Sequence, residues 1–571
     1  MTQKHKKKIK FLPKKHEGKI LRIIPLGGQE EVGRNMTVFE YGQDIVIIDM
    51  GIQFPEENMP GIDYIIPNTK YLRGREKQIR GVIFTHGHMD HIGAAPILLE
   101  KLGNPVIIGR PLTLALVKNR QEDLKKNSAK KLKTIVIKST RDRLRLGEFT
   151  VHFFPVDHSI MDAVGVVLET PKATIIHSGD WTYEEDPYGR PAVSYHQLAG
   201  LKKPSVLMIE SLAATNTRPH VPEKTVYANL EKLIASAPGR IIIGTFSSQI
   251  ERIKNLIPMA EKYGRKIAFD GYSMRMNVEV ARKLGYIKFQ KDTVIPIKKI
   301  SDYHDNKILI LCTGAQGEPE AVLSRMVDGS HKYVEIKKQD TIIFSSSIIP
   351  GNERTIQRLK DSIYRLSDNV IHSDIMDVHT SGHSTAADMV EIIKQIQPTY
   401  LLPVYANHYF LKEAAKLATG AGFPKDNIFV LDNGSVLEFL DGRPRLLANK
   451  IPSNYVMVDG LGIGDVGEVV LRDRNVLAQD GMVVIIVKID DKKKQLVDEP
   501  DIISRGFVYM KGSDRLMAET KQKVKDIFNS SPHRKTSYWA PLQGKIRDDI
   551  GQYLFNKTER RPMVLPVLIE V

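Results

Sequence analysis

Cysteine is nearly absent from this 571-residue chain, because Cys312 is the only one. A single thiol excludes an internal disulfide framework and leaves any metal site to histidine and carboxylate ligands. The sequence also lacks a run of eighteen apolar residues, and no apolar segment follows its basic N-terminus. We therefore expect neither a signal peptide nor a membrane span, and we predict a cytoplasmic protein.

Acidic residues are the scarcer charge: 67 Asp and Glu stand against 83 Lys and Arg, which gives a net charge of +16. The first twenty residues hold eight lysines and one glutamate, so residues 1–18 are predicted to be a basic, disordered tail. Lysine runs are often merely solvated. A chain whose whole balance is this basic nevertheless favours a polyanionic partner, and nucleic acid is the usual one.

The chain is too long for one core, and its length indicates about three or four domains. Strands and helices alternate up to residue 204, as in a layered α/β core. More regular α/β units follow, which predicts a separate domain with a parallel sheet. The Gly-rich stretch GGQEEVG lacks the spacing of a dinucleotide site and precedes a strand, so we reject a nucleotide-binding loop there. The predicted segments are a tail (1–18), a first domain in two parts (19–204 and 376–450), an inserted domain (205–375), a linker (451–463) and a C-terminal domain (464–571).

The stretch GVIFTHGHMDHIG, residues 81–93, carries the strongest chemical signal. A β-branched, apolar run leads into it and an amphipathic segment follows, so the polar cluster is predicted on a strand-to-helix loop. On such a loop His86 and His88 can converge on one metal while Asp90 and His91 turn toward a second. A turn of hydrogen-bonded histidines is the alternative, and HxHxDH directly after an apolar strand argues against it.

Further ligand-like residues stand where later strands end. His158 follows FTVHFFPVD, Asp180 closes ATIIHSGDW, and Asp49 closes IVIIDMG. Taken singly, each is equally well a turn aspartate or a capped histidine. Asp49 is also placed to accept a hydrogen bond from the N–H of a ligand imidazole. With HGHMDH they form an ordered series.

That series resembles the metallo-β-lactamase fold. Glu210 in LMIESLAATN and the segment HTSGH (379–383) resemble the β-CASP branch of this fold, which acts on nucleic acids. With PLGGQEEVGRN, CTGAQGEPEAVLSR, FSSSIIPGN, GIGDVG and DIISRGFVY, the likeness extends from about residue 20 to 571 and is to the ribonuclease J family. It implies an αββα sandwich with an inserted β-CASP parallel α/β domain and a small C-terminal α+β domain.

The resemblance also implies roles for these residues. His86, His88 and His158 would bind one zinc ion, Asp90 and His91 would contribute to a second, and Asp180 would bridge the two. A water between two such metals is lowered toward hydroxide at neutral pH and can attack phosphorus. Glu210 would act as an acid and His383 would assist at the scissile phosphate. Two further sets are implied at the RNA: residues His379, Thr380, Ser381, Gly382 and His383 on its backbone, and Ser345, Ser346 and Ser347, with the turn from Thr313 to Gln316, on a 5′-phosphate.

The sequence departs from the family pattern at one metal ligand. The family has a histidine in a PxHGE-like segment, whereas this chain has PVYAN, with Tyr405 in the place of the histidine. A neutral phenol is a poor zinc ligand, so the second metal would be held by Asp90, His91 and Asp180 with water or with His408. We therefore expect two Zn²⁺ per subunit, with a second site that is weakly occupied or that takes Mn²⁺ or Mg²⁺.

Three functions stay open at this point. The first is a metal-dependent ribonuclease with 5′-to-3′ exonuclease and endonuclease activity, acting in RNA maturation and mRNA decay on single-stranded RNA with a 5′-monophosphate. The second is a weakly active or inactive RNA-binding subunit that supports a paralogous nuclease. The third is hydrolysis of DNA or of a small molecule by the same site. The C-terminal domain resembles one that joins subunits, so a homodimer or homotetramer is expected, with no membrane partner.

Overall fold

The computed structural model of the protein describes residues 19–184, 191–318, 320–349, 351–490, 492–493, 495–508, 513–531 and 539–571. The predicted basic tail, residues 1–18, lies outside these ranges. The chain divides into two compact units, the first comprising residues up to 53 together with 66–455, and the second residues 54–65 and 456–571. No helix within the described ranges is long and apolar enough to cross a membrane.

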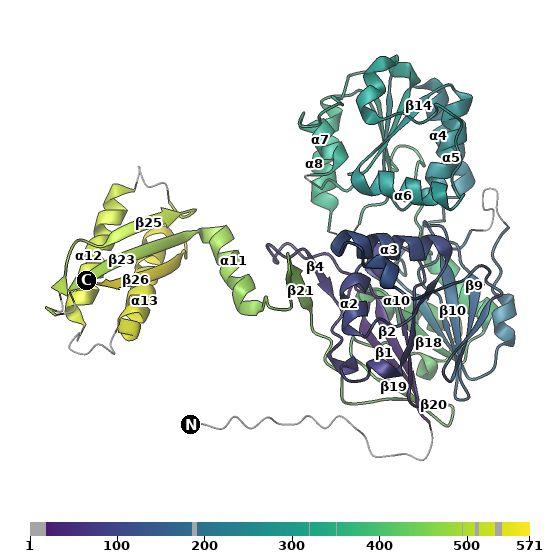
Figure 1. Ribbon diagram of the computed structural model, residues 1–571, viewed down its shortest axis with the longest axis horizontal. Coiled ribbons are helices and arrows are strands. Elements are labelled where there is room, and N and C mark those ends of the chain that lie inside the picture. Colours follow the sequence, from purple (N-terminus) through teal and green to yellow (C-terminus); the bar gives the residue numbers. More distant parts are fainter. Residues whose placement is uncertain are drawn as a thin grey trace. The chain divides into compact units, whose positions relative to one another are not determined.

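Two mixed sheets form the base of the first unit (Figure 1). In spatial order, the eight strands of the first sheet are β20 (Arg443–Leu446), β19 (Leu437–Leu440), β1 (Leu21–Gly27), β2 (Met36–Tyr41), β3 (Asp44–Ile48), β5 (Ile79–Ile83), β6 (Ile107–Gly109) and β7 (Thr134–Val136). The six strands of the second sheet are β18 (Tyr400–Val404), β12 (Ser205–Glu210), β11 (Thr174–His177), β10 (Val164–Glu169), β9 (Phe149–Pro155) and β8 (Arg143–Leu146).

The apolar core of this part lies between the two sheets, and the side-chain alternation of the strands explains how it forms. On β10, Val164, Val166 and Leu168 point into the core shared with the first sheet. Val167, between them, points to the opposite face and packs beneath helices. Strands buried on both faces need continuous apolar runs, which is the pattern that the sequence shows here.

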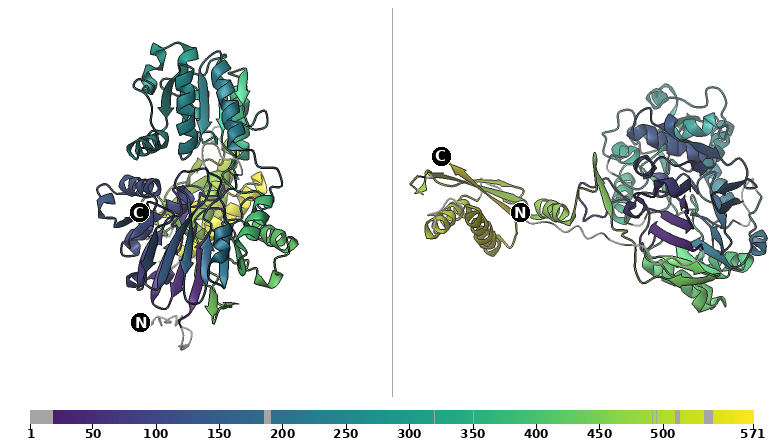
Figure 2. Two further views of the ribbon diagram at one scale, coloured as in Figure 1. Left: turned by 90° about the vertical axis from the view of Figure 1, so that its right-hand side faces the viewer. Right: turned by 60° about the horizontal axis from the view of Figure 1, so that its bottom comes forward.

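Helices cover the outer faces of both sheets, so the predicted αββα sandwich is confirmed (Figure 2 shows the same layers from two further directions). The helices of this part are α1 (Met89–Ile92), α2 (Ala95–Lys101), α3 (Pro111–Leu124), α9 (Ala386–Ile396) and α10 (His408–Gly420). Short 3-10 turns are η1 (Lys70–Leu72), η2 (Glu76–Gln78), η3 (Ala129–Lys131), η4 (His196–Gly200) and η7 (Lys425–Asn427).

A third sheet, wholly parallel, forms the inserted domain. Its strands, in spatial order, are β14 (Lys266–Asp270), β15 (Ile308–Cys312), β13 (Ile241–Thr245), β16 (Thr341–Ser345) and β17 (Asn369–Ile371). Figure 1 shows α4 and α5 on one side of this sheet and α7 and α8 on the other. The helical segments are α4 (Glu223–Ser236), α5 (Ile250–Lys262), α6 (Tyr272–Lys283), α7 (Val322–Val327), α8 (Glu353–Tyr364), η5 (Ile297–Asp302) and η6 (Asp305–Lys307).

Two segments pair differently from what strand alternation alone indicates. The sequence predicts that the inserted domain begins at residue 205, but β12 pairs with β11 and β18, so the parallel sheet of the insertion starts only at β13. Residues 451–463, predicted as a linker, contain β21 (Val456–Asp459) and β22 (Gly462–Ile463), which form a small sheet with β4 (Tyr64–Ile66). Alternation reveals a strand but not its neighbour.

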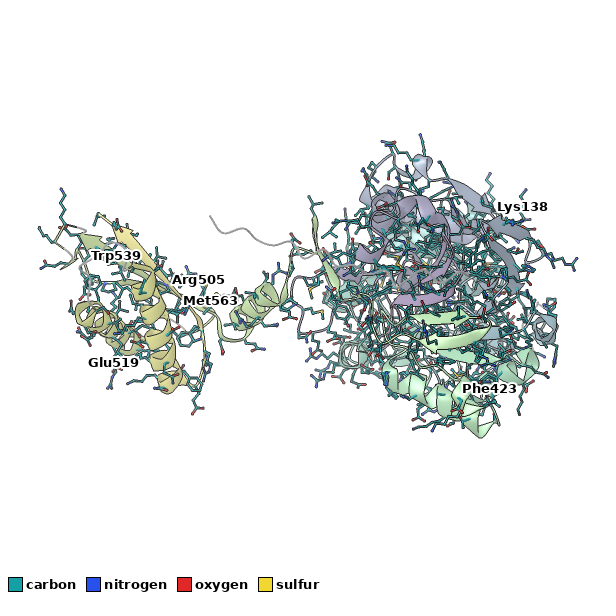
Figure 3. The ribbon with its side chains drawn as sticks, turned by 90° about the horizontal axis from the view of Figure 1, so that it is seen from below. Lys138, Phe423, Arg505, Glu519, Trp539 and Met563 are labelled. Carbon is teal, nitrogen blue, oxygen red and sulfur yellow. The ribbon has the colours of Figure 1, made fainter. Side chains whose placement is uncertain are left out.

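The second unit has its own sheet and core. Two long helices, α12 (Asp514–Ser530) and α13 (Trp539–Thr558), pack on one face of the sheet, and Figure 3 labels Glu519 and Trp539 on them. The sheet strands are β23 (Met482–Asp490), β24 (Gln495–Leu496), β25 (Asp501–Arg505) and β26 (Met563–Glu570). Helix α11 (Glu468–Asp480), which the sequence reasoning missed, precedes them. The predicted small α+β domain is confirmed.

Candidate metal centre and active site

The HGHMDH loop follows β5 directly and runs into α1, as the sequence predicts. The loop after β3 binds its backbone, because Met50 N–H donates to the carbonyl of His91 at 2.7 Å. Gly51 allows this close approach: a Cβ there would lie 1.5 Å from the Asp90 carbonyl oxygen. The ligand loop is therefore fixed by main-chain contacts before any side chain is considered.

A first group of four side chains converges at this loop. It consists of His86, His88, His158 and Asp180, whose ligand atoms all lie within 4.8 Å of one another. His88 Nδ1 is 3.1 Å from His86 Nε2 and 3.0 Å from His158 Nε2. In a tetrahedral zinc site with bonds of about 2.0–2.1 Å, neighbouring ligand atoms lie about 3.3 Å apart. The separations in this group therefore suit one ion of that size.

Each imidazole of the group has its outward nitrogen occupied. His158 Nδ1 lies 2.7 Å from the Gly382 carbonyl, to which it donates, and His86 Nδ1 lies 3.0 Å from Thr85 Oγ1. His88 Nε2 lies 3.1 Å from Ser248 Oγ, which belongs to the inserted domain. Such partners set the tautomer and leave the inward nitrogen free for a metal.

Burial keeps these three imidazoles in the neutral form that binds metal. It lowers the pKa of His88 to about 4 and that of His158 to about 3, and the pKa of His86 falls well below its usual value for the same reason. Neutral imidazole is the ligand state, so the group needs no proton release from histidine near neutral pH.

A second group shares Asp180 with the first and adds Asp90 and His91. His91 Nε2 lies 3.2 Å from Asp180 Oδ1 and 3.4 Å from Asp90 Oδ2. Behind it, His91 Nδ1 lies 2.8 Å from Asp49 Oδ2, and Asp49 also accepts from Thr85 N–H and Oγ1, both at 2.8 Å. Asp49 thus orients a ligand imidazole.

The charge around His91 favours a cation. Burial lowers the pKa of this imidazole, but the carboxylates of Asp180, Asp90 and Asp49 together raise it well above its ordinary value. Asp180 Oδ1 is buried, and its one close polar neighbour among the described residues is His91 Nε2. Concentrated, buried negative charge is the environment that a divalent ion neutralises. Both groups therefore fit metal ions.

Tyr405 lies beside the second group but is not a member of it. Its hydroxyl is 3.0 Å from His177 Nε2 and 3.5 Å from Asp49 Oδ2, and its ring centroid is 5.3 Å from that of His91. Burial, with the nearby carboxylates of Asp49 and Asp180, raises the pKa of this phenol well above its usual value. The phenol is therefore neutral, and the second group has three ligands where the first has four.

His408 lies elsewhere. Its Nδ1 is 3.6 Å from Asp432 Oδ1, and together with Glu30 these residues form a separate, exposed group. Lys450 already pairs with Asp432 there. In this structure, therefore, His408 does not replace Tyr405 at the metals.

Glu210 and His383 meet beside the first group. Glu210 Oε2 is 3.6 Å from His383 Nδ1, and neither atom has a hydrogen-bond partner among the described residues. The His383 ring centroid is 5.5 Å from that of His158. Burial lowers the pKa of His383, but Glu210 raises it more, to about 9. The two side chains can hold a proton next to the metal ligands.

The HTSGH segment is held by the inserted domain. Arg252 on α5 donates to His379 Nδ1 at 2.6 Å. Ser345 is fully buried, and its hydroxyl donates to the Val378 carbonyl at 2.8 Å. The hydroxyl of Ser345 is thus already bonded within the protein, whereas the sequence predicted that it contacts a 5′-phosphate.

Two further residues of the HTSGH segment also make contacts within the protein. Thr380 is buried, and its Oγ1 lies 3.5 Å from His220 Nε2. Ser381 Oγ accepts a hydrogen bond from His383 N–H at 3.1 Å.

Ser346 and Ser347 are more accessible. Gln316 organises their loop, since its Nε2 donates to the Ser347 carbonyl at 2.7 Å and its Oε1 accepts from Ile349 N–H at 2.9 Å. The turn from Thr313 to Gln316 and the serine loop therefore lie together.

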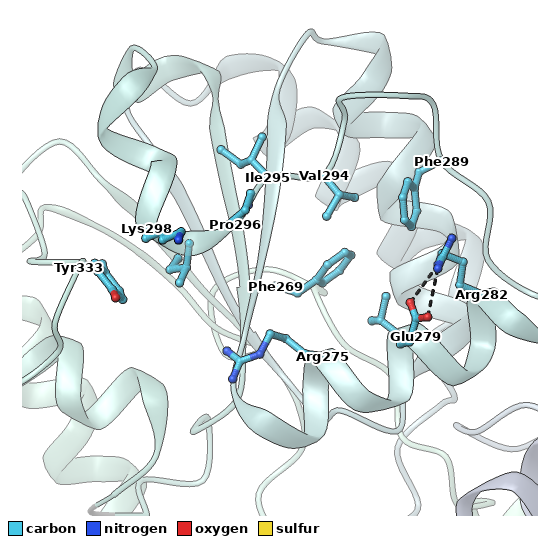
Figure 4. A pocket seen from close by; sticks show the side chains of 12 residues that line it. Phe269, Arg275, Glu279, Arg282, Phe289, Val294, Ile295, Pro296, Lys298 and Tyr333 are labelled. Atoms are coloured by element: carbon cyan, nitrogen blue, oxygen red, sulfur yellow. Dashed lines mark hydrogen bonds and ion pairs between the residues drawn. The ribbon is translucent and has the colours of Figure 1, made fainter.

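A cavity of about 500 Å³ lies away from these residues, beside β14 and the segment around Val294 that pairs with it (Figure 4). Phe269 and Phe289 line it together with Arg275 and Lys298. None of the metal-ligand residues contributes to it, so it is not part of the candidate active site.

Four contributors to the site were not singled out from the sequence: Asn35, His177, Ser248 and Arg252. Asn35 Nδ2 lies 2.9 Å from His91 Nε2 and 3.3 Å from Asp90 Oδ2. His177 stands three residues before Asp180 in the same strand end, which was an available signal. Ser248 and Arg252 follow β13, far from the ligand loop in sequence, and nothing local marks them.

Comparison with known proteins gives matches along the chain. Family models match residues 30–244 (Metallo-beta-lactamase superfamily), 238–363 (Ribonuclease J, beta-CASP domain) and 469–571 (Ribonuclease J C-terminal domain). Ribonuclease J2 of Bacillus subtilis (strain 168) is 35% identical over 560 residues, covering 98% of this chain and 100% of that protein. Ribonuclease J 1 of Streptococcus pyogenes serotype M3 is 36% identical over 552 residues, with 96% and 97% covered.

One solved structure shows a likeness of fold alone. It is a protein of unknown function from Enterococcus faecalis V583, with a TM-score of 0.52 and 15% sequence identity, covering 75% of this chain and 100% of that one. The sequence matches and the site geometry therefore carry the assignment together.

Proposed function

The chain belongs to the ribonuclease J family of metallo-β-lactamase-type nucleases, and from this we propose that it is a zinc-dependent ribonuclease with 5′-to-3′ exonuclease and endonuclease activity. It would act in the cytoplasm, in RNA maturation and mRNA decay. The observation that carries the proposal is the pair of ligand groups sharing Asp180, with Glu210 and His383 beside them.

The two groups would hold two ions of different affinity. The four ligands of the first suit zinc, because three neutral imidazoles and one carboxylate are a set that zinc prefers. The second, with Asp90, His91 and the shared Asp180, has more carboxylate and one ligand fewer, so it would bind zinc weakly or take Mn²⁺ or Mg²⁺. When bound, such ions activate water and neutralise charge at phosphorus.

The side chains around the ions would position the RNA. His383, kept protonated by the neighbouring Glu210 carboxylate, would neutralise a phosphate oxygen. The Glu210–His383 pair would act as the acid that gives a proton to the leaving oxygen, and the proton released by the attacking water would restore the pair. The segment from His379 to His383 would follow the RNA backbone. Ser346 and Ser347, with the turn ending at Gln316, would bind a 5′-monophosphate. Ser345 would hold their loop in place through its hydrogen bond to the Val378 carbonyl.

The second unit would join subunits into a homodimer or homotetramer. One face of its sheet packs on α12 and α13, whereas the other leaves Leu565, Val567 and Ile569 of β26 each 41% exposed. An apolar face of this kind favours association with a second copy. A Val567→Asp variant should dissociate in sedimentation velocity, whereas Lys521→Asp, on α12, should not.

The decisive experiment measures turnover of a single-stranded RNA with a 5′-monophosphate, with and without chelator. Activity that chelator removes and zinc restores supports the proposal. A 5′-hydroxyl RNA and a circular RNA separate exonuclease from endonuclease cleavage, and DNA of the same sequence tests substrate class. RNA binding with negligible turnover would instead favour a weakly active subunit that supports a paralogous nuclease.

A further inference from the structure

A dense group of cations lies between α3 and β9 and has no role in the proposed chemistry. Residues 125–145, defined here as the basic band, contain nine Lys and Arg residues and a single acidic residue, Asp142. The net charge of +8 within these 21 residues is half of the charge of the whole chain. Figure 3 shows Lys138 of the band projecting outward at the periphery of its unit.

The charge of the band is hardly neutralised within the protein. Lys125 pairs with Glu100 at 3.2 Å, but the other eight cations form no ion pair within the described part of the chain. Asp142 offsets one of these charges without forming an ion pair, and its carboxylate accepts hydrogen bonds from the backbone N–H groups of Lys138 and Ser139 at 2.9 and 3.2 Å. Isolated surface lysines are normally just solvated, whereas eight unpaired cations on one continuous segment repel one another unless an anion approaches.

The fold spreads these cations along one edge of the sandwich. β7 is the last strand of the first sheet and β8 is the last strand of the second, so the band crosses from one sheet to the other. On β8, Leu144 and Leu146 pack toward the core between the sheets, and Arg143 and Arg145 therefore point to the opposite face. Arg143 and Arg145 are two residues apart, so their attachment points on the strand are about 7 Å apart, comparable to neighbouring phosphates of an extended nucleic-acid strand.

The band also begins beside the inserted domain. At the end of α3, Asp123 Oδ1 accepts a hydrogen bond from the Tyr272 hydroxyl of α6 at 2.9 Å. The first cations of the band follow at once. The band therefore starts where the first domain and the inserted domain touch.

We propose that the basic band is a secondary RNA-binding surface, which contacts phosphates of the substrate outside the metal centre. Its contacts are to the backbone, so it adds affinity for longer RNA without base preference. The proposal rests on RNA being the substrate. An acidic protein is the less suited partner, because Val136 is the one large apolar side chain of the band that is exposed, and an interface between proteins needs a larger apolar core.

The test compares two fourfold charge reversals in the full-length protein. The band variant changes Lys131, Lys133, Arg143 and Arg145 to Glu. The control variant changes Lys288, Lys291, Lys298 and Lys299, which are equally exposed and form no ion pair within the described ranges, to Glu. Both alter net charge identically. Affinity for a forty-nucleotide and a five-nucleotide RNA is measured without metal, as a function of salt, and turnover of the short RNA is measured with metal.

The expected result is a loss confined to the band variant and the long RNA. Each lost phosphate contact lowers the slope of log affinity against log salt by about 0.7, so four contacts lower it by about 3. Between 50 and 200 mM salt this equals about a 50-fold difference in salt sensitivity. Turnover of the short RNA should not change.

An equal effect of both variants, or none, overturns the inference, since net charge rather than the band would then govern binding. A wild-type protein that binds and cleaves RNA alongside an unaffected band variant refutes the band alone. Failure of the wild-type protein to bind RNA at all refutes the proposed function instead. Thermal melting of each variant checks that it is folded.

Discussion

The two ligand groups of the metal centre differ in the number of their ligands and in the contacts that hold those ligands. The first group has four ligands, and each of its three imidazoles has a defined partner on its outer nitrogen. The second has three ligands, and a neutral tyrosine stands beside it instead of a further imidazole. Ligand number and outer partners both set affinity, so the two positions should differ in occupancy although they share Asp180.

The two ligand groups are also held by different parts of the chain. The first group depends in part on the inserted domain, because Ser248 contacts His88 from there. The second depends on the first domain, where Asp49 and Asn35 hold His91. Substitutions on the two sides should therefore affect different ions, and their effects should fall in a definite order.

The largest effect is expected for His88→Ala, which removes one of the four ligands of the first group. A bound metal lowers the activation barrier by several kcal/mol, so turnover should fall by at least about a thousandfold when the ligand is removed. Metal content and RNA cleavage are measured together, and circular dichroism should remain unchanged because the loop backbone is held by main-chain contacts. Full activity in protein that has lost the metal would contradict a metal mechanism.

Asp49→Asn should have the next largest effect, through His91. The change removes the charge that holds Nδ1 of this imidazole, and loss of such an outer partner typically costs 10–100-fold in metal affinity or activity. Competition with a chromogenic chelator measures the affinity of each ion. The matched control is Asp44→Asn at the start of the same strand, where the carboxylate pairs with Arg80; that variant should keep its metals.

Tyr405→His tests the second ligand group directly. An added ligand should raise affinity for the second ion about tenfold, or about 1.4 kcal/mol, and turnover should rise if that ion limits the rate. Tyr405→Phe keeps the ring without offering a ligand, and is the control. Equal stoichiometry in all three proteins would show that position 405 does not face the second ion.

Ser248→Ala should cost less than tenfold in affinity at the first group. It removes one hydrogen bond, from His88 Nε2, and such a bond contributes about 1 kcal/mol. Ser247→Ala, one residue earlier, is the control because Ser247 is bonded to Asn277 instead. If the loss appears at the second ion, the proposed division between the two halves is wrong.

The smallest effect is expected for His408→Ala. Because His408 is directed to Asp432 in a separate group, metal stoichiometry and cleavage rate should match those of the unaltered protein. A large loss of the second metal would mean that His408 moves to take the place of the missing histidine.

Much of this centre follows from local sequence. An apolar strand followed at once by HGHMDH places four potential ligands on one loop, and strand ends carrying Asp49, His158 and Asp180 complete the series. The alternation of apolar side chains likewise indicates the layered sheets. These features depend on neighbours within a few residues, so periodicity and residue type are enough to predict them.

The sequence by itself thus determined which residues can bind metal, on which elements they stand, and that one position departs from its family. Only the tertiary structure decided which nitrogen of each imidazole faces inward, that Ser248 and Gly382 orient two of them, that the Ser345 hydroxyl is already used, and that β12 pairs in the second sheet. These outcomes join residues that lie between about thirty and more than two hundred positions apart. Which of many chemically equivalent partners a side chain meets is set by packing of the whole chain, and no local pattern encodes it.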